Sequence, residues 1–462
     1  MSPHGSGPLD DAAAPVRSAP VTSAPGPGPS TSGAGAPPVA ATSWPGASGA
    51  DSAPGEAPLP GHAPTAPRSE ELPSDVVVLD GPLEGHPAAL LPRLRRALSR
   101  PGPAVVVATS GSTGRPKKTV LSTEALTASG RATERATSGT GQWLLCLPAH
   151  YVAGVQVLVR SVLAGTEPVV MAAEHFTPGA FADAAERLSH PVRCVSVVPT
   201  QLQRILDPHD GAPDPRAVAA LARFDAVLVG GSPLAPDLAA RAEDAGVRVV
   251  RTYGMSETCG GCVYDGTALD AVTVRVVPDP DAAGPPSSAG SPRGSEGRIW
   301  LGGDVVAAGY LDDPAQTAAH FRVLDGQRWY RTDDLGAVDE RGELTVLGRT
   351  DDVVNTGGVK VSAGRVAAVL LEDERVRQAL AVALPHPEWG QAVAAVIAPR
   401  PGAAENAEQR GTLERELAET VRARLGAPAA PKLWRHVAAL PLLSTGKPDR
   451  RAAVELFAGH AT

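Results

Sequence analysis

The feature that most constrains the fold of this chain is a regular alternation of short apolar runs with helical patterns between residues 75 and 254. The apolar runs are DVVVLDG (75–81), AVVVATS (104–110), WLLCLP (143–148), EPVVMAA (167–173), VRCVSVVP (192–199), DAVLVGG (225–231) and VRVVRTYG (247–254). Helical stretches such as GAFADAAERLS (179–189) and PDLAARAEDAG (236–246) separate them. Continuous apolar runs between helices are typical of parallel strands that are covered on both faces. The alternation therefore predicts an α/β domain.

The pattern changes twice further along the chain. A Pro/Gly/Ser-rich insertion over residues 278–297 interrupts the alternation, and GRIWLGGD (297–304) and GELTVLGR (342–349) then predict antiparallel strands. From residue 348 onward, two helical patterns enclose the strand patterns QALAVALP (378–385) and AVAAVIAP (392–399). This arrangement predicts a second, compact α+β domain of smaller size.

The first 72 residues are dominated by Pro, Ala, Gly and Ser and have no hydrophobic period. Such a segment buries too little apolar surface to offset its ordering entropy, which predicts a disordered tail. A start codon misplaced upstream of the true one is an alternative explanation. The sequence thus predicts a tail over residues 1–72, a large domain over 73–349 and a small, mobile domain over 350–462.

Composition excludes several classes of protein. The formal net charge of −8 disfavours a nucleic-acid partner that is bound through counterion release. Four cysteines in 462 residues do not make a disulfide scaffold, so a reducing cytoplasm is expected. No apolar run approaches the length of a membrane helix, and the N-terminus has no secretory pattern, so we expect no stable membrane insertion. The sequence leaves the oligomeric state open, and a homodimer is compatible with it.

A polar loop, TSGSTGRPKK (109–118), follows the second apolar run. Its glycines let backbone N–H groups turn towards oxyanions, its hydroxyls add donors, and Lys117 adds a point charge. The loop is not a Walker motif, because counting from Gly111 the sixth position is Pro116 instead of glycine. The pattern favours a phosphate-binding loop of another kind, with a generic Ser/Gly turn as the alternative.

Five ordered motifs resemble those of the adenylate-forming enzymes, the superfamily of acyl-CoA synthetases, adenylation domains and luciferases. The motifs are TSGSTGRPKK (109–118), YGMSE (253–257), YRTDDLG (330–336), GRTDDVVNTGGVKVS (348–362) and STGKPDR (444–450). Three positions depart from the family pattern: Lys118 and Asp333 replace glycines, and Ser256 replaces threonine. The resemblance extends from about Asp75 to the C-terminus.

The resemblance implies a large N-terminal domain with mixed sheets and flanking helices, followed by a small mobile α+β domain. It implies a reaction in two steps, in which a carboxylate attacks the α-phosphate of MgATP and a thiol, usually of coenzyme A, then displaces AMP. The implied cofactors are ATP, Mg²⁺ and coenzyme A, and the implied partners are a small carboxylic acid and coenzyme A.

The nucleotide site is assigned by matching each motif position. The ATP-binding residues that the resemblance implies are Thr109, Ser110, Gly111, Ser112, Thr113, Gly114, Lys117, Gly230, Gly231, Tyr253, Gly254, Ser256, Asp334 and Arg349. Glu257 is expected to bind Mg²⁺, a hard cation that prefers oxygen ligands. Judged alone, Tyr253 could be a core residue, Asp334 part of a solvated turn and Glu257 a surface carboxylate.

The C-terminal motifs imply a moving catalytic group. By resemblance, Lys447 is the lysine that bridges the carboxylate and the α-phosphate in the first step, although in isolation it reads as a surface lysine. Asp351 matches the hinge about which the small domain rotates between the two steps. Gly357 and Gly358 are expected to face the pantetheine arm of coenzyme A in the second step.

The acyl pocket is predicted from two stretches. His150 follows a strand and opens a helix, a position that borders the acyl site in this family, and we assign it to catalysis and substrate binding. Arg160 lies about three turns further along this apolar helix and needs a partner. That partner is either a substrate carboxylate or an acidic side chain of the protein.

The second stretch is CGGC (259–262), which follows Glu257. We interpret Gly260 and Gly261 as the floor of the pocket, where small residues leave room for a flat ring; a redox pair of cysteines is the alternative. Together with Arg160, this floor predicts an aromatic dicarboxylic acid as substrate. Other aryl- or medium-chain acid–CoA ligases, a free-standing protein that loads a carrier-protein thiol, and a non-catalytic nucleotide-binding module remain alternatives.

Overall fold

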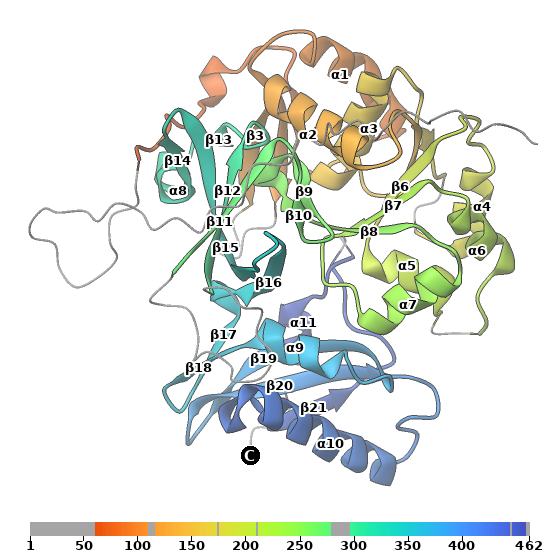
Figure 1. Ribbon diagram of the computed structural model, residues 1–462, viewed down its shortest axis with the longest axis vertical. Helices are drawn as coiled ribbons and strands as arrows, with labels where there is room; N and C mark the ends of the chain where they lie inside the picture. Colours follow the sequence, from red (N-terminus) through yellow and green to blue (C-terminus); the bar gives the residue numbers. More distant parts are fainter. Residues whose placement is uncertain are drawn as a thin grey trace, which may run out of the picture. The chain divides into compact units, whose positions relative to one another are not determined.

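The structure is a computed structural model that describes residues 61–109, 116–172, 175–208, 211–278, 296–443 and 446–458 (Figure 1). Most of the predicted tail therefore lies outside the described residues. So do six residues of the phosphate loop and two residues of the lysine motif, which are Ser110, Gly111, Ser112, Thr113, Gly114, Arg115, Ser444 and Thr445. No described helix has the length and apolar character that a membrane-spanning segment requires.

A seven-stranded sheet with the strand order β10-β9-β8-β7-β6-β4-β5 forms the centre of the α/β part. Its strands are β4 (Gln142–Leu145), β5 (Val169–Val170), β6 (Arg193–Val197), β7 (Ala226–Gly230), β8 (Val249–Met255), β9 (Gly260–Tyr264) and β10 (Thr267–Ala268). Strands β5, β4, β6, β7 and β8 are parallel, as the apolar runs predict, whereas β9 turns back antiparallel to β8. The fold is therefore α/β with a mixed sheet.

Helices cover both faces of this sheet, because successive residues of a strand point to opposite sides. Trp143 and Cys194 face one core, whereas Leu144 and Val195 face the other. The first face is covered by α2 (Thr123–Ala136) and α3 (Val152–Ala164), and α1 (Leu91–Ala97) packs against α3. The second is covered by α4 (Pro178–Ala185), α5 (Pro199–Leu206), α6 (Pro215–Ala222) and α7 (Pro236–Asp244), which lie on the opposite side in Figure 1.

Two smaller sheets lie beside the seven-stranded sheet. The first has the order β1-β2-β3-β13 and consists of β1 (Val77–Leu79), β2 (Pro103–Thr109), β3 (Lys117–Ser122) and β13 (Gly309–Tyr310). The second contains β11 (Val272–Val277), β12 (Gly297–Gly303), β14 (Phe321–Leu324), β15 (Gln327–Val338) and β16 (Leu344–Arg349), with α8 (Pro314–His320) before β14. The first two apolar runs thus pair with each other outside the seven-stranded sheet, and β2 and β3 form a hairpin around the phosphate loop.

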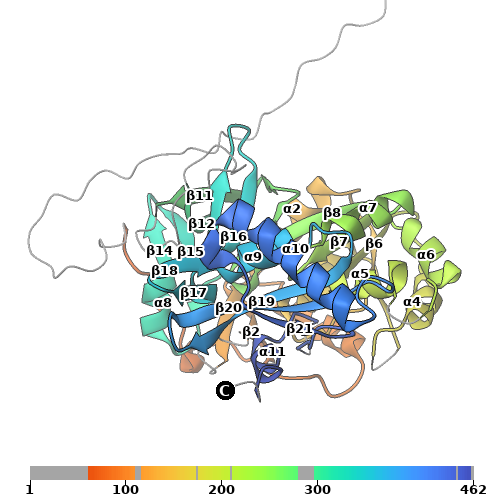
Figure 2. The ribbon, with the colours of Figure 1, turned by 90° about the horizontal axis from the view of Figure 1, so that it is seen from below.

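The C-terminal lobe, residues 353–458, contains a fourth sheet with its own helices (Figure 2). Its elements are β17 (Val353–Thr356), β18 (Val359–Ser362), α9 (Ala363–Leu370), β19 (Val376–His386), β20 (Gly390–Pro399), α10 (Ala407–Leu425), β21 (Leu433–His436) and α11 (Arg450–Glu455). Alternating residues of β19 and β20 pack into two cores. One core also includes apolar residues of α9 and α10, and the other includes Ala453 of α11. We call residues 61–349 the N-terminal lobe; the predicted domain boundaries themselves stay predictions.

Residues 61–72 have defined contacts, although the sequence places them in the tail. His62 exchanges two backbone hydrogen bonds with Val323 of β14, at 3.1 and 2.8 Å. The backbone N–H of Ser69 donates to Asp312, and Ala66 is buried. The chain is therefore ordered upstream of Asp75, where the apolar pattern begins.

Candidate active site

Tyr253, Asp334 and Arg349 meet where β8, β15 and β16 come together. The phenol of Tyr253 donates a hydrogen bond of 2.7 Å to Asp334 Oδ2, and Arg349 Nη1 lies 3.4 Å from Asp334 Oδ1. Burial raises the pKa of Asp334, and the Tyr253 hydrogen bond and the Arg349 charge offset part of that rise. Residues from three separate sequence motifs thus form one hydrogen-bonded group.

Arg349 connects this group to the predicted hinge. Its guanidinium makes two hydrogen bonds of 2.7 Å to the carboxylate of Asp351. These bonds and the charge of Arg349 outweigh burial and lower the pKa of Asp351. Asp333, the residue that departs from the family glycine, lies 3.8 Å from Arg349 and is hydrogen-bonded to Arg298 at 3.2 Å. The carboxylate that Asp333 introduces at this position is therefore paired with Arg298.

Glu257 lies in a single 3₁₀ turn, Ser256–Thr258, directly after β8, and the residue is only 7% exposed. Its Oε1 accepts a hydrogen bond of 2.7 Å from the phenol of Tyr310, and its backbone carbonyl accepts one of 2.9 Å from Ala307. No cluster of three or more His, Cys, Asp or Glu side chains suited to a metal occurs in the described ranges. A lone carboxylate fits Mg²⁺, which is commonly held by one or two carboxylates together with water and substrate phosphates.

The phosphate loop is closed by a pair of described residues. Thr109 ends β2 opposite Lys117, which begins β3, and the Thr109 hydroxyl donates to the Lys117 carbonyl at 3.3 Å. The ammonium group of Lys117 lies 5.1 Å from the centre of the Tyr310 ring. Lys118, which also departs from the family pattern, forms an exposed ion pair with Asp80. Lys117, which is expected to bind phosphate, therefore lies next to Tyr310, the residue whose phenol contacts Glu257.

Lys447 reaches this site from the C-terminal lobe. A β-carbon added at Gly231 would lie 3.5 Å from Lys447 Cε, and the carbonyl of Gly446 accepts a hydrogen bond of 3.3 Å from Thr200. Burial lowers the pKa of Lys447, and the like charge of Arg349 lowers it further, whereas Asp334 and Glu257 oppose the shift. The structure therefore brings Lys447 together with the nucleotide-site residues that the sequence predicts.

Polar contacts between the lobes hold this arrangement. Arg400, just after β20, pairs with Asp207 at 2.6 Å and also with Asp237. The side-chain amide of Gln378 on β19 donates to Gln203 on α5 at 2.6 Å. We call Arg400 with its two acidic partners the lobe clasp.

The comparisons with known proteins agree with this geometry. The family model described as AMP-binding enzyme matches residues 52–311, and that of the AMP-binding enzyme C-terminal domain matches residues 365–447. The chain belongs to the AMP-binding enzyme family. This result confirms the resemblance to adenylate-forming enzymes that the five motifs carry.

One relative of this AMP-binding enzyme is a probable 2-succinylbenzoate–CoA ligase from Mycobacterium tuberculosis. The two are 41% identical over 365 residues, which cover 78% of this chain and 85% of that protein. Among solved structures, ATP-bound MatB from Rhodopseudomonas palustris matches with a TM-score of 0.63 and 25% identity, over 78% of this chain and 69% of that one. The o-succinylbenzoate CoA synthetase MenE of Bacillus subtilis, with its acyl-adenylate intermediate, has a TM-score of 0.60 and 24% identity, covers 76% and 69%, and supports the fold.

The expected acyl side of the AMP-binding enzyme contains a strained turn. Cys259 has a positive φ of 52°, and its carbonyl accepts hydrogen bonds from Ser129 at 3.0 Å and from Gln156 at 2.5 Å. A β-carbon at Gly254 would lie 2.1 Å from the Gly260 carbonyl, so only glycine fits there. One at Gly260 would meet Gln156 at 3.2 Å. Sequence reasoning missed Ser129 and Gln156, because polar residues in helices α2 and α3 carry no motif.

His150 and Arg160 differ in how deeply they are buried. His150 is half-buried two residues before α3, it lies against Tyr151, and burial lowers its pKa. Arg160 is 6% exposed, and its guanidinium carbon lies 4.9 Å from the centre of the Trp143 ring. Burial lowers the pKa of Arg160, and its Nε has no hydrogen-bond partner. No described acidic side chain pairs with Arg160, so the protein-acid alternative finds no support in the described residues.

Two further predicted residues lie in the C-terminal lobe, and the two cysteines of the CGGC stretch lie in the N-terminal lobe. Gly357 and Gly358, both with positive φ, form the turn between β17 and β18, and the N–H of Gly357 donates to the carbonyl of Trp389 at 2.9 Å. Cys259 and Cys262 are free and fully buried, and burial raises both thiol pKa values, that of Cys262 to about 12. Thiols with raised pKa values are poor nucleophiles, which disfavours the redox alternative.

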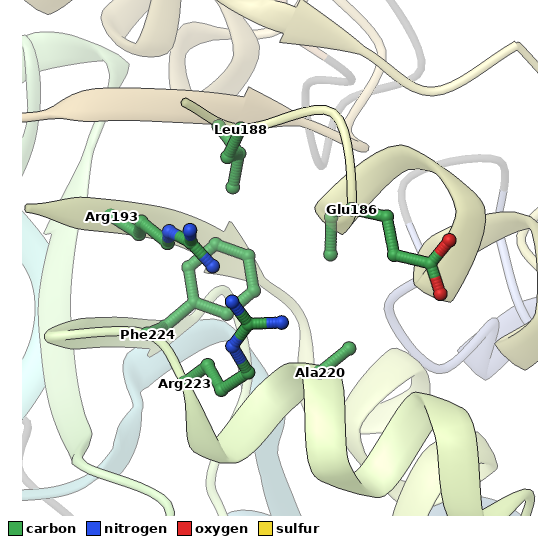
Figure 3. Close-up of a pocket in the computed structure, with 7 residues that line it drawn as sticks. Glu186, Leu188, Arg193, Ala220, Arg223 and Phe224 are labelled. Atoms are coloured by element: carbon green, nitrogen blue, oxygen red, sulfur yellow. The ribbon is translucent and has the colours of Figure 1, made fainter. Parts of the chain in front are cut away.

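A pocket away from these residues lies between α4, β6 and α6 (Figure 3). Arg193, Arg223 and Phe224 line it together with Glu186. Its cavity volume is about 10 Å³, close to the minimum for one water molecule, so it cannot hold a nucleotide or an acyl group.

Proposed function

We propose that this chain is an ATP-dependent acid–CoA ligase that converts 2-succinylbenzoate to o-succinylbenzoyl-CoA in menaquinone biosynthesis, releasing AMP and pyrophosphate. The observation that carries the proposal is the burial of Lys447 within the field of Glu257, Asp334 and Arg349. The 41% identity to a probable 2-succinylbenzoate–CoA ligase supports the choice of acid. ATP, Mg²⁺ and coenzyme A follow from membership of the AMP-binding enzyme family.

In the first step, a carboxylate oxygen of the acid bonds to the α-phosphorus of ATP, and the bond from that phosphorus to the pyrophosphate breaks. Lys447 stabilises the negative charge that grows between the two anions as they approach. Asp334 accepts hydrogen bonds from the ribose hydroxyls, and the ring of Tyr253 packs on the adenine. Mg²⁺, when it is bound by Glu257, neutralises phosphate charge and makes pyrophosphate a better leaving group.

The flanking residues of the site complete this assignment. Gly230 and Gly231 let the adenine approach the end of β7, and Ser256 donates to the α-phosphate. Lys117 and Thr109, with the loop residues between them, hold the departing phosphates. These roles rest on the motif matches and on the hairpin that brings Thr109 opposite Lys117.

The acid is assigned to the space beside the Cys259 turn. His150 borders the reacting carboxylate, and Gly260 and Gly261 accept the ring. Arg160 is proposed to bind the second carboxylate, since an almost fully buried guanidinium with an unpartnered Nε retains a donor for an anion. Gln156 lies one helical turn nearer to the Cys259 carbonyl on the same face of α3.

In the second step, the thiol sulfur of coenzyme A bonds to the acyl carbon, and the bond from that carbon to the phosphate oxygen breaks. Rotation about Asp351 removes Lys447 and brings Gly357 and Gly358 to the pantetheine arm. The Arg349–Asp351 ion pair at the hinge supports this assignment, because it ties the pivot to the ribose-binding group.

ATP–pyrophosphate exchange over a panel of acids tests the proposal. We expect exchange with 2-succinylbenzoate and much less with benzoate, medium-chain fatty acids or malonate, followed by thioester formation when coenzyme A is added. Exchange with a different acid alone would overturn the choice of substrate. Transfer to a carrier-protein thiol but not to coenzyme A would overturn the choice of acceptor.

Arg160→Met tests the second-carboxylate assignment, because it keeps the length and apolar stem of the side chain. We expect KM for 2-succinylbenzoate to rise roughly tenfold, as one charged contact of about 1.4 kcal/mol is lost. The KM for ATP should not change. An unchanged KM for the acid would show that Arg160 does not bind the second carboxylate.

We further propose that the enzyme is cytoplasmic and forms a homodimer. Four buried thiols, none of them in a disulfide, support a reducing compartment. Sedimentation of the purified protein tests the dimer, and fractionation of the source cells tests the compartment.

A further inference from the structure

Tyr310 is a fully buried phenol whose position is fixed by its neighbours. It ends the short strand β13, pairs with Thr119 of β3, and is 1% exposed. Phe321 and His320 pack edge-on against its ring, with ring centres 5.3 and 6.2 Å away. The phenol oxygen of Tyr330 lies 3.3 Å from that of Tyr310. The ring therefore has little freedom to move.

The segment that ends in Tyr310 holds Glu257 at two points. The Tyr310 phenol donates to Glu257 Oε1 at 2.7 Å, and the N–H of Ala307 donates to the Glu257 carbonyl at 2.9 Å. Burial and the adjacent Glu257 charge raise the pKa of Tyr310, so the phenol keeps its proton and acts as a donor. Glu257 thus has its backbone and one carboxylate oxygen fixed by the segment 307–310, which ends in β13.

The same ring faces the phosphate side of the site. Lys117 Nζ lies 5.1 Å from the Tyr310 ring centre, within the range of a cation–π contact. Tyr310 therefore touches both a carboxylate and a cation that are expected to bind the triphosphate. Neither a sequence motif nor the proposed function assigns a role to Tyr310.

We propose that Tyr310 is a positioning residue for Mg²⁺ binding: it holds Glu257 Oε1 through its hydroxyl, so that Oε2 is presented to the metal, and its ring keeps Lys117 beside the phosphates. This inference rests on the proposed function, in which Glu257 binds Mg²⁺. Hydrogen bonds to a carboxylate ligand orient it, and their loss typically weakens metal binding by about 10- to 100-fold.

Tyr310→Phe removes the hydroxyl but retains the ring and its contact with Lys117. The test measures binding of ATP to the full-length protein by calorimetry across a Mg²⁺ titration, without acid or coenzyme A. We expect the Mg²⁺ concentration for half-maximal ATP binding to rise about tenfold. At saturating Mg²⁺, the ATP affinity should return to within about twofold of the original value.

Tyr330→Phe is the matched control, since it removes a neighbouring buried phenol oxygen that lies 3.3 Å from that of Tyr310, whereas the hydroxyl that donates to Glu257 Oε1 is that of Tyr310. Its Mg²⁺ dependence should equal that of the unaltered protein. An unchanged Mg²⁺ dependence in Tyr310→Phe, or an equal shift in both variants, would overturn the proposal.

Glu257→Gln supplies a second measurement that does not depend on the stability of one variant. If Tyr310 acts through Glu257, adding Tyr310→Phe to Glu257→Gln should cause no further shift in the Mg²⁺ dependence; independent, additive shifts would contradict the proposal. The assay contains no acid, so its result does not depend on which acid the enzyme activates. If ATP binding to the unaltered protein needs no Mg²⁺, the metal assignment of Glu257 fails, and the role of Tyr310 fails with it.

Discussion

Glu257 and Lys447 bring opposite charges to the same site, and the two side chains are held there in different ways. Glu257 is fixed within the N-terminal lobe by Tyr310 and Ala307. Lys447 arrives from the C-terminal lobe, where its neighbour Gly446 contacts Thr200 across the lobe interface and Arg400 pairs with two acidic residues.

The difference fits the proposed function, in which Glu257 stays in the site through both steps and Lys447 leaves it between them. A buried carboxylate that is hydrogen-bonded to a fully buried phenol moves only if the surrounding core opens. Ion pairs and single hydrogen bonds between lobes contribute little net free energy each, so they can form and break as the reaction proceeds. A reaction that needs the lysine in one step and not in the other requires this arrangement.

Replacing Lys447 should have the largest effect on the first half-reaction. We expect Lys447→Ala to slow ATP–pyrophosphate exchange by roughly a hundredfold or more, since a cation aimed at developing charge is lost. Thioester formation from preformed acyl-adenylate should fall by less than about threefold. The two half-reactions are measured separately by rapid quench. Equal losses in both would show that Lys447 is needed in both steps and does not leave the site between them.

The pH dependence of the first half-reaction should reveal the burial of Lys447. Because burial lowers its pKa, this lysine loses its proton at a lower pH than an ordinary lysine. We expect kcat/KM for exchange to fall about tenfold per pH unit above that lowered pKa. Lys447→Arg should abolish this alkaline fall, whatever its absolute rate, because a guanidinium stays protonated. A fall that persists in Lys447→Arg must come from another group.

Weakening the lobe clasp should have a moderate effect. Arg400→Gln leaves Asp207 and Asp237 without their partner and should destabilise the docked arrangement by about 1 kcal/mol. We therefore expect exchange to slow about fivefold, with no loss in the thioester step. Arg410→Gln, an exposed change on α10 away from these acids, is the matched control. An unchanged exchange rate would show that the clasp does not hold Lys447 in place.

Salt should produce the smallest effect. Raising the ionic strength from about 0.05 to 0.5 M screens the partly exposed ion pairs of the lobe clasp. We expect this change to slow exchange in the unaltered protein, and the slowing should be about twofold greater there than in Arg400→Gln. The Mg²⁺ dependence of ATP binding should respond equally in the two proteins. Identical salt responses for exchange would mean that the clasp contributes no free energy to docking.

Much of the fold and part of the site could be predicted from the sequence. The parallel strands follow from apolar runs, and motifs with fixed local spacing place Glu257 and Arg349 at strand ends and Asp334 within β15. Even Lys447, remote in sequence, reaches the predicted neighbourhood.

What could not be predicted depends on pairing between distant strands. Tyr310 meets Glu257 only because β13 pairs with β3, and β3 belongs to a sheet whose strands resemble those of the central sheet in composition. Arg160 shows a second limit, because an arginine in an apolar helix signals a need for a partner without saying what that partner is. Here the guanidinium lies on Trp143, a contact that leaves no pattern in the sequence.

The backbone pairing of His62 with Val323 has a practical consequence for handling the protein. Strand β14 is the last strand of its sheet, and His62 occupies part of its free edge. An uncovered strand edge offers unpaired N–H and C=O groups to other chains and promotes aggregation. A shortened protein that begins at residue 61 should stay dispersed at high concentration, whereas one that begins at residue 75 should self-associate through this edge.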